Sequence, residues 1–368
     1  MNRASFIVEA PGRLCLFGEH QDYLNLPVIA SSLPLKCRIH VQPDAGGRVL
    51  TLRVPVLNQV KKYNLDQLPP RQGVSSATTD KDFEPDFALA SIYEALDDGW
   101  TFESGADCES TTDIPLQAGC SSSSAFCVAW SLVLARLAGH EKELLDDPIK
   151  LAQRAHRAEV THFGAPGGTM DHVTSAVGGL LRIGPDPWAA ERFKFDKDRE
   201  DCWVLAYSGD PKDTFGHLHR CKNARLTLLD KLNGDWDADT SGIELSEDEQ
   251  NLLSATLVNR DMERKAAEVL RGGSASGQEL GKMMQRHHEA LRDGLLLSTA
   301  ALEKLMKAAI DDGAYGFKVV GSGGGGCGVA WTSKEKATKV KMSMYDAGAS
   351  QVWVIESPGT GAGLFVDN

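Results

Sequence analysis

A cluster of charged and hydrogen-bonding side chains follows a short apolar run near the start of the chain. The segment opens with Pro11, Gly12 and Arg13 and closes with Glu19, His20, Asp22 and Tyr23. Each carboxylate accepts several hydrogen bonds, so acidic side chains crowded behind a buried strand suit a ligand with many hydroxyl groups. A polar hairpin turn is the alternative interpretation, because loops serve both purposes.

A serine-rich turn lies directly before an apolar stretch, residues 123–137, that we expect to be a buried helix. The turn consists of Gly119, Cys120, Ser121, Ser122, Ser123 and Ser124. Small side chains let a ligand approach the backbone, and the N–H groups and dipole of a first helical turn attract phosphate. A serine hydroxyl there can also bind Mg²⁺. The alternative is a simple serine cap, although four serines exceed what a cap needs.

Two further carboxylates could take part in chemistry. Glu159 stands late in an expected helix, and Asp171 follows the Gly- and Pro-rich residues 164–168. Because Asp171 precedes an apolar stretch, it is either a helix N-cap or a carboxylate that accepts or orients a hydroxyl proton.

Residues 321–328 contain six glycines and match the pattern GxGxxG. A dinucleotide-binding turn would lead into a helix, whereas residues 329–332 have the composition of a strand, and no lysine for a Walker A loop is present. We therefore interpret this segment as a tight hairpin that packs closely against another part of the molecule.

Strands and helices must position these side chains, and the hydrophobic pattern predicts both. Strands are expected at residues 6–9, 14–17, 38–41, 48–54, 180–183, 203–207, 317–320, 329–332 and 352–355. Helices are expected at residues 86–97, 123–137 and 147–163, and within 247–312 on either side of a break at 272–277. Residues 55–83 are polar and rich in turn formers, so we interpret them as a long surface loop. The fold class is therefore α+β.

The composition limits the classes of function. A length of 368 residues exceeds one ordinary core, so we expect two domains, 1–200 and 201–368. A net charge of −12 argues against binding to nucleic acid or to an anionic membrane. The chain has no long apolar run and no secretory signal, so its eight cysteines are expected to be reduced thiols of a cytoplasmic protein. The HxHxC of residues 217–221 and the pair His287 and His288 lack the spacing of a zinc site.

Taken in order, these segments resemble the GHMP small-molecule kinase superfamily and, within it, the galactokinases. The first motif of that family has the form PGRxxLxGEHxDY, and the chain reads PGRLCLFGEHQDY. The second motif is similar to residues 115–125, the GIMDQ element to 168–172, and the third motif, GxGxGGC, to 321–327. The resemblance implies a two-domain α+β GHMP kinase fold with the active site in the cleft between the domains.

The resemblance also implies roles for the residues that match the motifs. Asp171 would accept or orient the hydroxyl proton of the substrate, and Arg13 would keep that carboxylate ionised. Ser123 and Glu159 would bind the Mg²⁺ that accompanies ATP, and the backbone of residues 119–124 would hold the phosphates. The sugar would be bound by Glu19, His20, Asp22 and Tyr23. The implied activity is phosphorylation of a monosaccharide by ATP, most simply at C1 of galactose, by a monomer or weak homo-oligomer.

The chain departs from the family pattern at several positions, and these leave the substrate open. Gln117, Cys120, Ser124 and His172 replace other residues of the motifs, and Lys222 stands where galactokinases carry a tyrosine that contacts the sugar. A lysine there favours an acidic or modified sugar, or it lies in solvent. The alternatives are a kinase for a uronic acid, an N-acetylhexosamine, arabinose or fucose, and a galactokinase-like sensor that binds sugar and ATP without catalysis.

Overall fold

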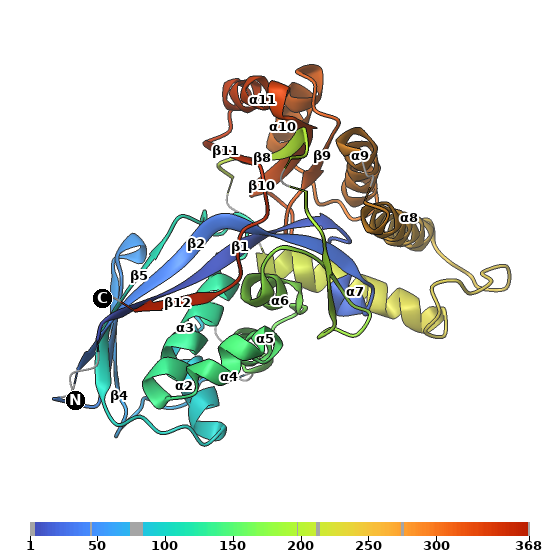
Figure 1. The fold of residues 1–368 in the computed structure, drawn as a ribbon. Helices are drawn as coiled ribbons and strands as arrows, with labels where there is room; N and C mark the ends of the chain where they lie inside the picture. The colour runs from blue at the N-terminus through green and yellow to red at the C-terminus, as the bar shows by residue number, and fades with distance from the viewer. Residues whose placement is uncertain are drawn as a thin grey trace.

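The computed structural model describes residues 4–44, 46–73, 84–196, 198–210, 214–273 and 276–366, without the side chains of 214–219. Two β-sheets, each covered by helices, make up the fold (Figure 1). This architecture confirms the α+β class.

The first sheet has eight strands among the described residues. They are β1 (Phe6–Phe17), β2 (Val28–Asp44), β3 (Val49–Val54), β4 (Gln59–Asn64), β5 (Gly105–Thr112), β6 (Leu180–Ile183), β7 (Ala190–Phe193) and β12 (Gly363–Val366). The order is β12-β1-β2-β5-β3-β4, while β6 pairs with β2 and β7. The β3–β5 pair is parallel and the other pairs are antiparallel.

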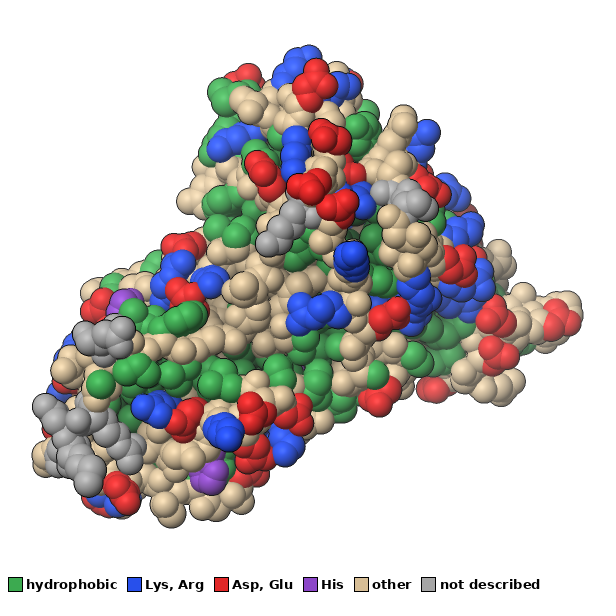
Figure 2. Space-filling model, in the orientation of Figure 1, with side chains coloured by type: hydrophobic (Ala, Val, Ile, Leu, Met, Phe, Trp, Pro, Cys, Tyr) green, Lys and Arg blue, Asp and Glu red, His purple; other side chains and the backbone are tan. Residues whose placement is uncertain are grey.

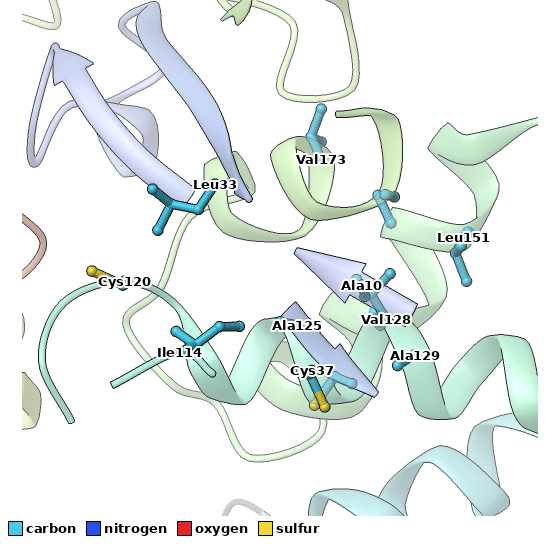
Figure 3. Close-up of a cluster of buried hydrophobic side chains, with 14 of the residues drawn as sticks. Ala10, Leu33, Cys37, Ile114, Cys120, Ala125, Val128, Ala129, Leu151 and Val173 are labelled. Atoms are coloured by element: carbon cyan, nitrogen blue, oxygen red, sulfur yellow. The ribbon is translucent and has the colours of Figure 1, made fainter. Parts of the chain in front are cut away.

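Five helices of the N-terminal half pack beside this sheet: α2 (Phe87–Asp97), α3 (Ser122–Ala138), α4 (Glu141–Asp146), α5 (Pro148–His156) and α6 (Met170–Val177). Helix α3 is apolar on nearly every side because it is surrounded by β1, β2, α5 and α6. Figure 3 shows Ala125, Val128 and Ala129 of α3 beside Ala10 of β1, and Val173 of α6 belongs to the same buried cluster. This packing fixes the direction in which the N-terminus of α3 points.

The second sheet has the order β11-β8-β10-β9, with every pair antiparallel. Its strands are β8 (Asp201–Tyr207), β9 (Gly316–Val319), β10 (Cys327–Ser333) and β11 (Gln351–Ile355). The helices of this half are α7 (Thr214–Lys231), α8 (Glu247–Arg271), α9 (Gly277–Asp293), α10 (Ala300–Asp311) and α11 (Lys334–Asp346). In Figure 1, β8, β9, β10 and β11 lie above the first sheet with α10 and α11 over them.

Most predicted elements are present, and two of the differences have clear causes. The expectation of a loop over residues 55–83 is wrong for its first part, which contains the 3₁₀ turn Pro55–Leu57 and the edge strand β4. Only Tyr63 of β4 is buried, so its sequence lacks a strong apolar pattern. Residues 74–83 of that expected loop lie outside the described residues. The predicted helix over 147–163 begins as expected at Pro148, but after His156 it becomes a π-helical turn, Arg157–Thr161.

The division at residue 200 stays a prediction. The second sheet begins at Asp201, but β12 returns from the end of the chain to pair with β1 in the first sheet.

All eight cysteines are buried. None of the helices in the described residues combines the length and apolar character needed to cross a bilayer. On the face shown in Figure 2, acidic and basic side chains are interspersed.

Candidate active site

An ion pair between Arg13 and Asp171 lies at the centre of the site. Arg13 is on β1, where the register with β2 shifts between Pro11 and Arg13, and Asp171 is in the first turn of α6. Arg13 Nε donates to Asp171 Oδ1 at 2.7 Å, and Arg13 Nη1 donates to the carbonyl of Gly119. One buried guanidinium therefore joins three of the segments that the sequence analysis singled out.

The charge of Asp171 is stabilised by its surroundings. Burial raises the pKa of Asp171, but the charge and hydrogen bond of Arg13 and the nearby Ser121 hydroxyl outweigh it and leave the pKa below its usual value. The Ser121 hydroxyl lies close to the carboxylate, although no hydrogen bond of normal geometry joins them. Asp171 is not the N-cap of α6, since Thr169 occupies that position. The capping alternative is thus wrong.

Asp22 approaches the same helix end from the first motif. Its Oδ2 accepts a hydrogen bond of 3.3 Å from the backbone N–H of Met170. Gly168 packs so tightly here that a Cβ atom would come within 2.0 Å of Asp22 Oδ2. Burial and the nearby Asp171 carboxylate raise the pKa of Asp22 to about 6. Two carboxylates thus lie next to each other at the N-terminus of α6.

The N-terminus of α3 is left open by its own side chains. Ser121 occupies the N-cap position with φ of +59° but makes no capping hydrogen bond. The N–H groups of the first helical turn have no partners within the helix, so they remain available to an anion. The simple serine cap is therefore wrong.

Glu159 lies close to this helix end. It stands in the π-helical turn, and its Oε2 is 2.7 Å from Nε2 of His172. Burial raises the pKa of Glu159, but His172 and the hydroxyls of Ser123 and Ser124 lower it below its usual value. The π turn thus brings a carboxylate to the serine-rich segment.

The glycine-rich hairpin packs against the loop before α3, as the sequence predicts. A Cβ atom on Gly119 would come within 2.3 Å of the Val320 carbonyl oxygen, and one on Gly326 within 2.7 Å of the Ala118 carbonyl oxygen. The backbone N–H of Cys327 donates to the same Ala118 oxygen at 2.7 Å. The glycines are needed because two backbones meet without room for side chains.

The remaining residues of the first motif contact the C-terminal half of the chain. Glu19 Oε2 accepts a hydrogen bond of 2.5 Å from Nζ of Lys318 on β9. The Tyr23 hydroxyl lies 2.9 Å from His20 Nδ1 and accepts a hydrogen bond from Arg225 of α7. Lys318 was not predicted from the sequence, and no role was predicted for Arg225. A lysine in the middle of an apolar strand beside a glycine loop was the available signal.

Comparison with known families agrees with this arrangement. The model of the GHMP kinase N-terminal domain matches residues 87–179, and that of the GHMP kinase C-terminal domain matches residues 267–349. The galactokinase galactose-binding signature matches residues 1–43. This chain belongs to the GHMP kinase family.

Relatives within the GHMP kinases differ in their acceptor. The chain is 27% identical over 353 residues to a mevalonate kinase of Thermococcus gammatolerans, with 94% of each chain covered. It is 24% identical over 340 residues to a galactokinase of Pyrococcus furiosus, with 90% of each covered. The structure of Lactococcus lactis galactokinase complexed with galactose has a TM-score of 0.80 at 18% identity, covering 98% of this chain and 95% of that one. GHMP kinases are ATP-dependent, so the comparisons establish the kinase class and leave the acceptor open.

The hydroxyl oxygen of Ser123 and the carboxylate oxygens of Glu159 are of the kind that binds the Mg²⁺ that GHMP kinases generally use with ATP. Mg²⁺ bound with a nucleotide needs only one or two protein oxygens, because phosphates and water complete its shell. The described residues contain no group of three or more His, Cys, Asp or Glu side chains that could hold a metal ion. The side chains of His217 and His219 lie outside the described residues.

Proposed function

We propose that this GHMP kinase transfers the γ-phosphoryl group of ATP to a monosaccharide hydroxyl, most simply the C1 hydroxyl of galactose or a close relative. The products are a sugar 1-phosphate and ADP. The observation that carries the proposal is the ion pair between the buried Arg13 and the partly exposed Asp171, with the Asp22 carboxylate beside it. The match to the galactose-binding signature supports the same acceptor class.

In this proposal Asp171 acts directly on the acceptor hydroxyl. Its lowered pKa keeps it ionised at neutral pH, so it accepts a hydrogen bond from the hydroxyl and then its proton. Arg13 holds the carboxylate in place and adds positive charge where the transferred phosphoryl group gathers negative charge. The main contribution of the site is positioning, since phosphoryl transfer proceeds through a loose transition state.

The phosphates of ATP would lie at the N-terminus of α3. The N–H groups of Ser122, Ser123 and Ser124 and the helix dipole supply positive potential there without any lysine. Ser123 and Glu159 would hold Mg²⁺, which neutralises phosphate charge when bound. A chain with a net charge of −12 could thereby bind the triphosphate of ATP.

The sugar would lie between Asp171 and the first motif. Glu19 and Asp22 would accept hydrogen bonds from its hydroxyl groups, and His20 would contact the ring from a backbone with φ of +63°. Tyr23 holds His20 through their 2.9 Å contact and binds Arg225 of α7. Such a set of acceptors suits a polyol better than a simple alcohol.

An ADP-release screen of the purified protein tests the proposal. The panel contains galactose, glucose, arabinose, fucose, N-acetylgalactosamine, galacturonate, glucuronate and mevalonate, each with MgATP. We expect a sugar to stimulate ADP release and mevalonate to leave it at the background rate. Turnover of mevalonate alone would contradict the sugar proposal, and binding of sugar and ATP without ADP release would indicate a sensor.

A second candidate, an acidic sugar, is favoured by the cations around Tyr23. Lys222 Nζ lies 5.7 Å and Arg225 Cζ 5.3 Å from the centre of the Tyr23 ring. Lys222 Nζ is 3.4 Å from the Pro166 carbonyl oxygen, and no carboxylate among the described residues pairs with either cation. Arg225 is fully buried, and its Nη1 has no partner among the described residues.

The screen separates the two acceptors when it is repeated with Lys222→Met. A uronate kinase should lose at least about tenfold in kcat/KM for galacturonate, because a charged hydrogen bond typically contributes that much. The same variant should keep most of its activity on galactose. Equal loss on both sugars would argue against an anionic substrate.

A further inference from the structure

The ion pair between Glu19 and Lys318 joins the two halves of the chain at the candidate sugar site. Glu19 follows β1 in the first sheet, and Lys318 lies in β9 of the second sheet. Nζ of Lys318 is 2.5 Å from Oε2 of Glu19, and the side chains are 0% and 2% exposed. The GHMP kinase motifs named above assign no role to this lysine.

The burial of this pair needs an explanation other than stability. Removing two charges from water is costly, and apolar residues of similar size are often at least as stabilising as a buried ion pair. The pair also stands among other charges. The thiol of Cys15 has its pKa raised by burial and by Glu19, whereas Lys318 and Arg13 lower it. Glu19, Lys318 and Arg13 therefore all lie near enough to the buried Cys15 thiol to change its pKa.

Lys318 is held in a fixed position by its own strand. Its Nζ also donates to the Val319 carbonyl oxygen at 2.6 Å, and its backbone pairs with Val329 of β10. The N–H of Val319 donates to Nδ1 of the buried His288 at 3.3 Å. An ammonium group held in this way fixes the orientation of the carboxylate that it binds.

One oxygen of Glu19 remains available. Oε2 is occupied by Lys318, while Oε1 accepts no hydrogen bond from the described residues. With Oε2 fixed by Lys318 and the charge of Arg13 nearby, Oε1 of Glu19 is a hydrogen-bond acceptor held in one orientation. That is the arrangement needed to select a hydroxyl group at a single position of a ligand.

We propose that Lys318 is a positioning residue that aims Oε1 of Glu19 at one hydroxyl group of the sugar. This proposal rests on the proposed sugar kinase function. The second sheet thereby determines specificity at a site built mainly from the first. Without the ammonium group, the carboxylate loses both its counter-charge and its orientation, and discrimination at that hydroxyl is lost.

Kinetics with single-deoxy sugars test the proposal. The substrate found in the screen is compared with each of its monodeoxy analogues, using wild type, Glu19→Gln, Lys318→Met and Lys318→Arg. Lys36→Met is the matched control, because Lys36 forms a 2.5 Å ion pair with Glu9 away from the site. If Lys318→Met does not fold, Lys318→Gln replaces it, since Gln keeps a donor and removes the charge.

We expect wild type to lose at least about tenfold in kcat/KM on one analogue, as expected for a hydrogen bond to a charged group. Glu19→Gln and Lys318→Met should both abolish discrimination against that same analogue, with the KM for ATP changed less than about twofold. Lys318→Arg should retain part of the discrimination against that analogue, and Lys36→Met should retain all of it.

Full discrimination in the neutral Lys318 variant would overturn the proposal, and so would equal losses for all sugars and for ATP. Those results leave the sugar kinase proposal standing. Failure of wild type to phosphorylate any sugar would overturn the sugar kinase proposal and this one together.

Discussion

Replacing Asp22 by Asn should make the folded protein more stable above pH 6. Burial and the nearby Asp171 carboxylate raise the pKa of Asp22 from 3.8 to about 6. The folded protein therefore holds this proton more tightly than the unfolded chain does. The stability that Asp22 contributes is fully present below about pH 4 and is lost as the pH rises through about 6.

The magnitude follows from the two pKa values. A rise from 3.8 to about 6 corresponds to about 3 kcal/mol of unfolding free energy, which is the cost of ionising Asp22 at pH 8 in the folded state. Asn has the same shape and keeps an oxygen to accept the 3.3 Å hydrogen bond from the Met170 N–H. Asp22→Asn should thus exceed wild type by up to about 3 kcal/mol at pH 8 and match it near pH 4.

Urea unfolding of the ligand-free protein at several pH values between 4 and 8 measures this difference. Asp66→Asn serves as a control, because the side chain of Asp66 is 64% exposed and should show no comparable trend. A variant less stable than wild type at pH 8, or a difference that does not change with pH, would show that ionised Asp22 does not destabilise the folded protein. The same substitution should raise the KM for sugar far more than the KM for ATP, since it removes a carboxylate acceptor.

Two further predictions concern the phosphate end of the site. Glu159→Gln should raise the Mg²⁺ concentration for half-maximal activity at least about tenfold, because Mg²⁺ prefers an anionic oxygen; an unchanged Mg²⁺ titration would contradict this role. Gly119→Ala should lower Tm and weaken ATP binding, since Gly119 has φ of +92° and its added Cβ would lie 2.3 Å from the Val320 oxygen. Gly139→Ala controls for the backbone conformation, because Gly139 has φ of +84° but no atom within 4 Å of the added Cβ. Equal effects of the two Ala substitutions would show that the close contact is unimportant.

The residues that form the site could be predicted from the sequence better than the contacts between them. Local patterns placed Arg13 at the start of a strand, Asp171 near a helix start and the serines before an apolar helix, and the structure brings these segments together. Spacing alone left a helix cap as an alternative role for Asp171. The observed start of α6 decides against it, because Thr169 is the N-cap residue, while Asp171 binds Arg13, 158 positions away.

Contacts between distant segments could not be predicted from the sequence. Lys318 lies in an apolar run that reads as an ordinary buried strand, and its partner Glu19 is 299 positions away. β4 was missed because an edge strand with one buried side chain resembles a polar loop. The return of β12 to the first sheet depends on the whole topology, which no local pattern encodes.

The most direct test of the proposed mechanism is sugar-dependent ADP release by Asp171→Ala, together with Asp171→Asn, which keeps the side-chain shape. Circular dichroism and ATP binding should show that both variants are folded. We expect turnover to fall by about 10²–10⁴-fold, the usual contribution of a positioned base. Retention of more than about a tenth of wild-type turnover would remove Asp171 from the chemistry and contradict the proposed mechanism.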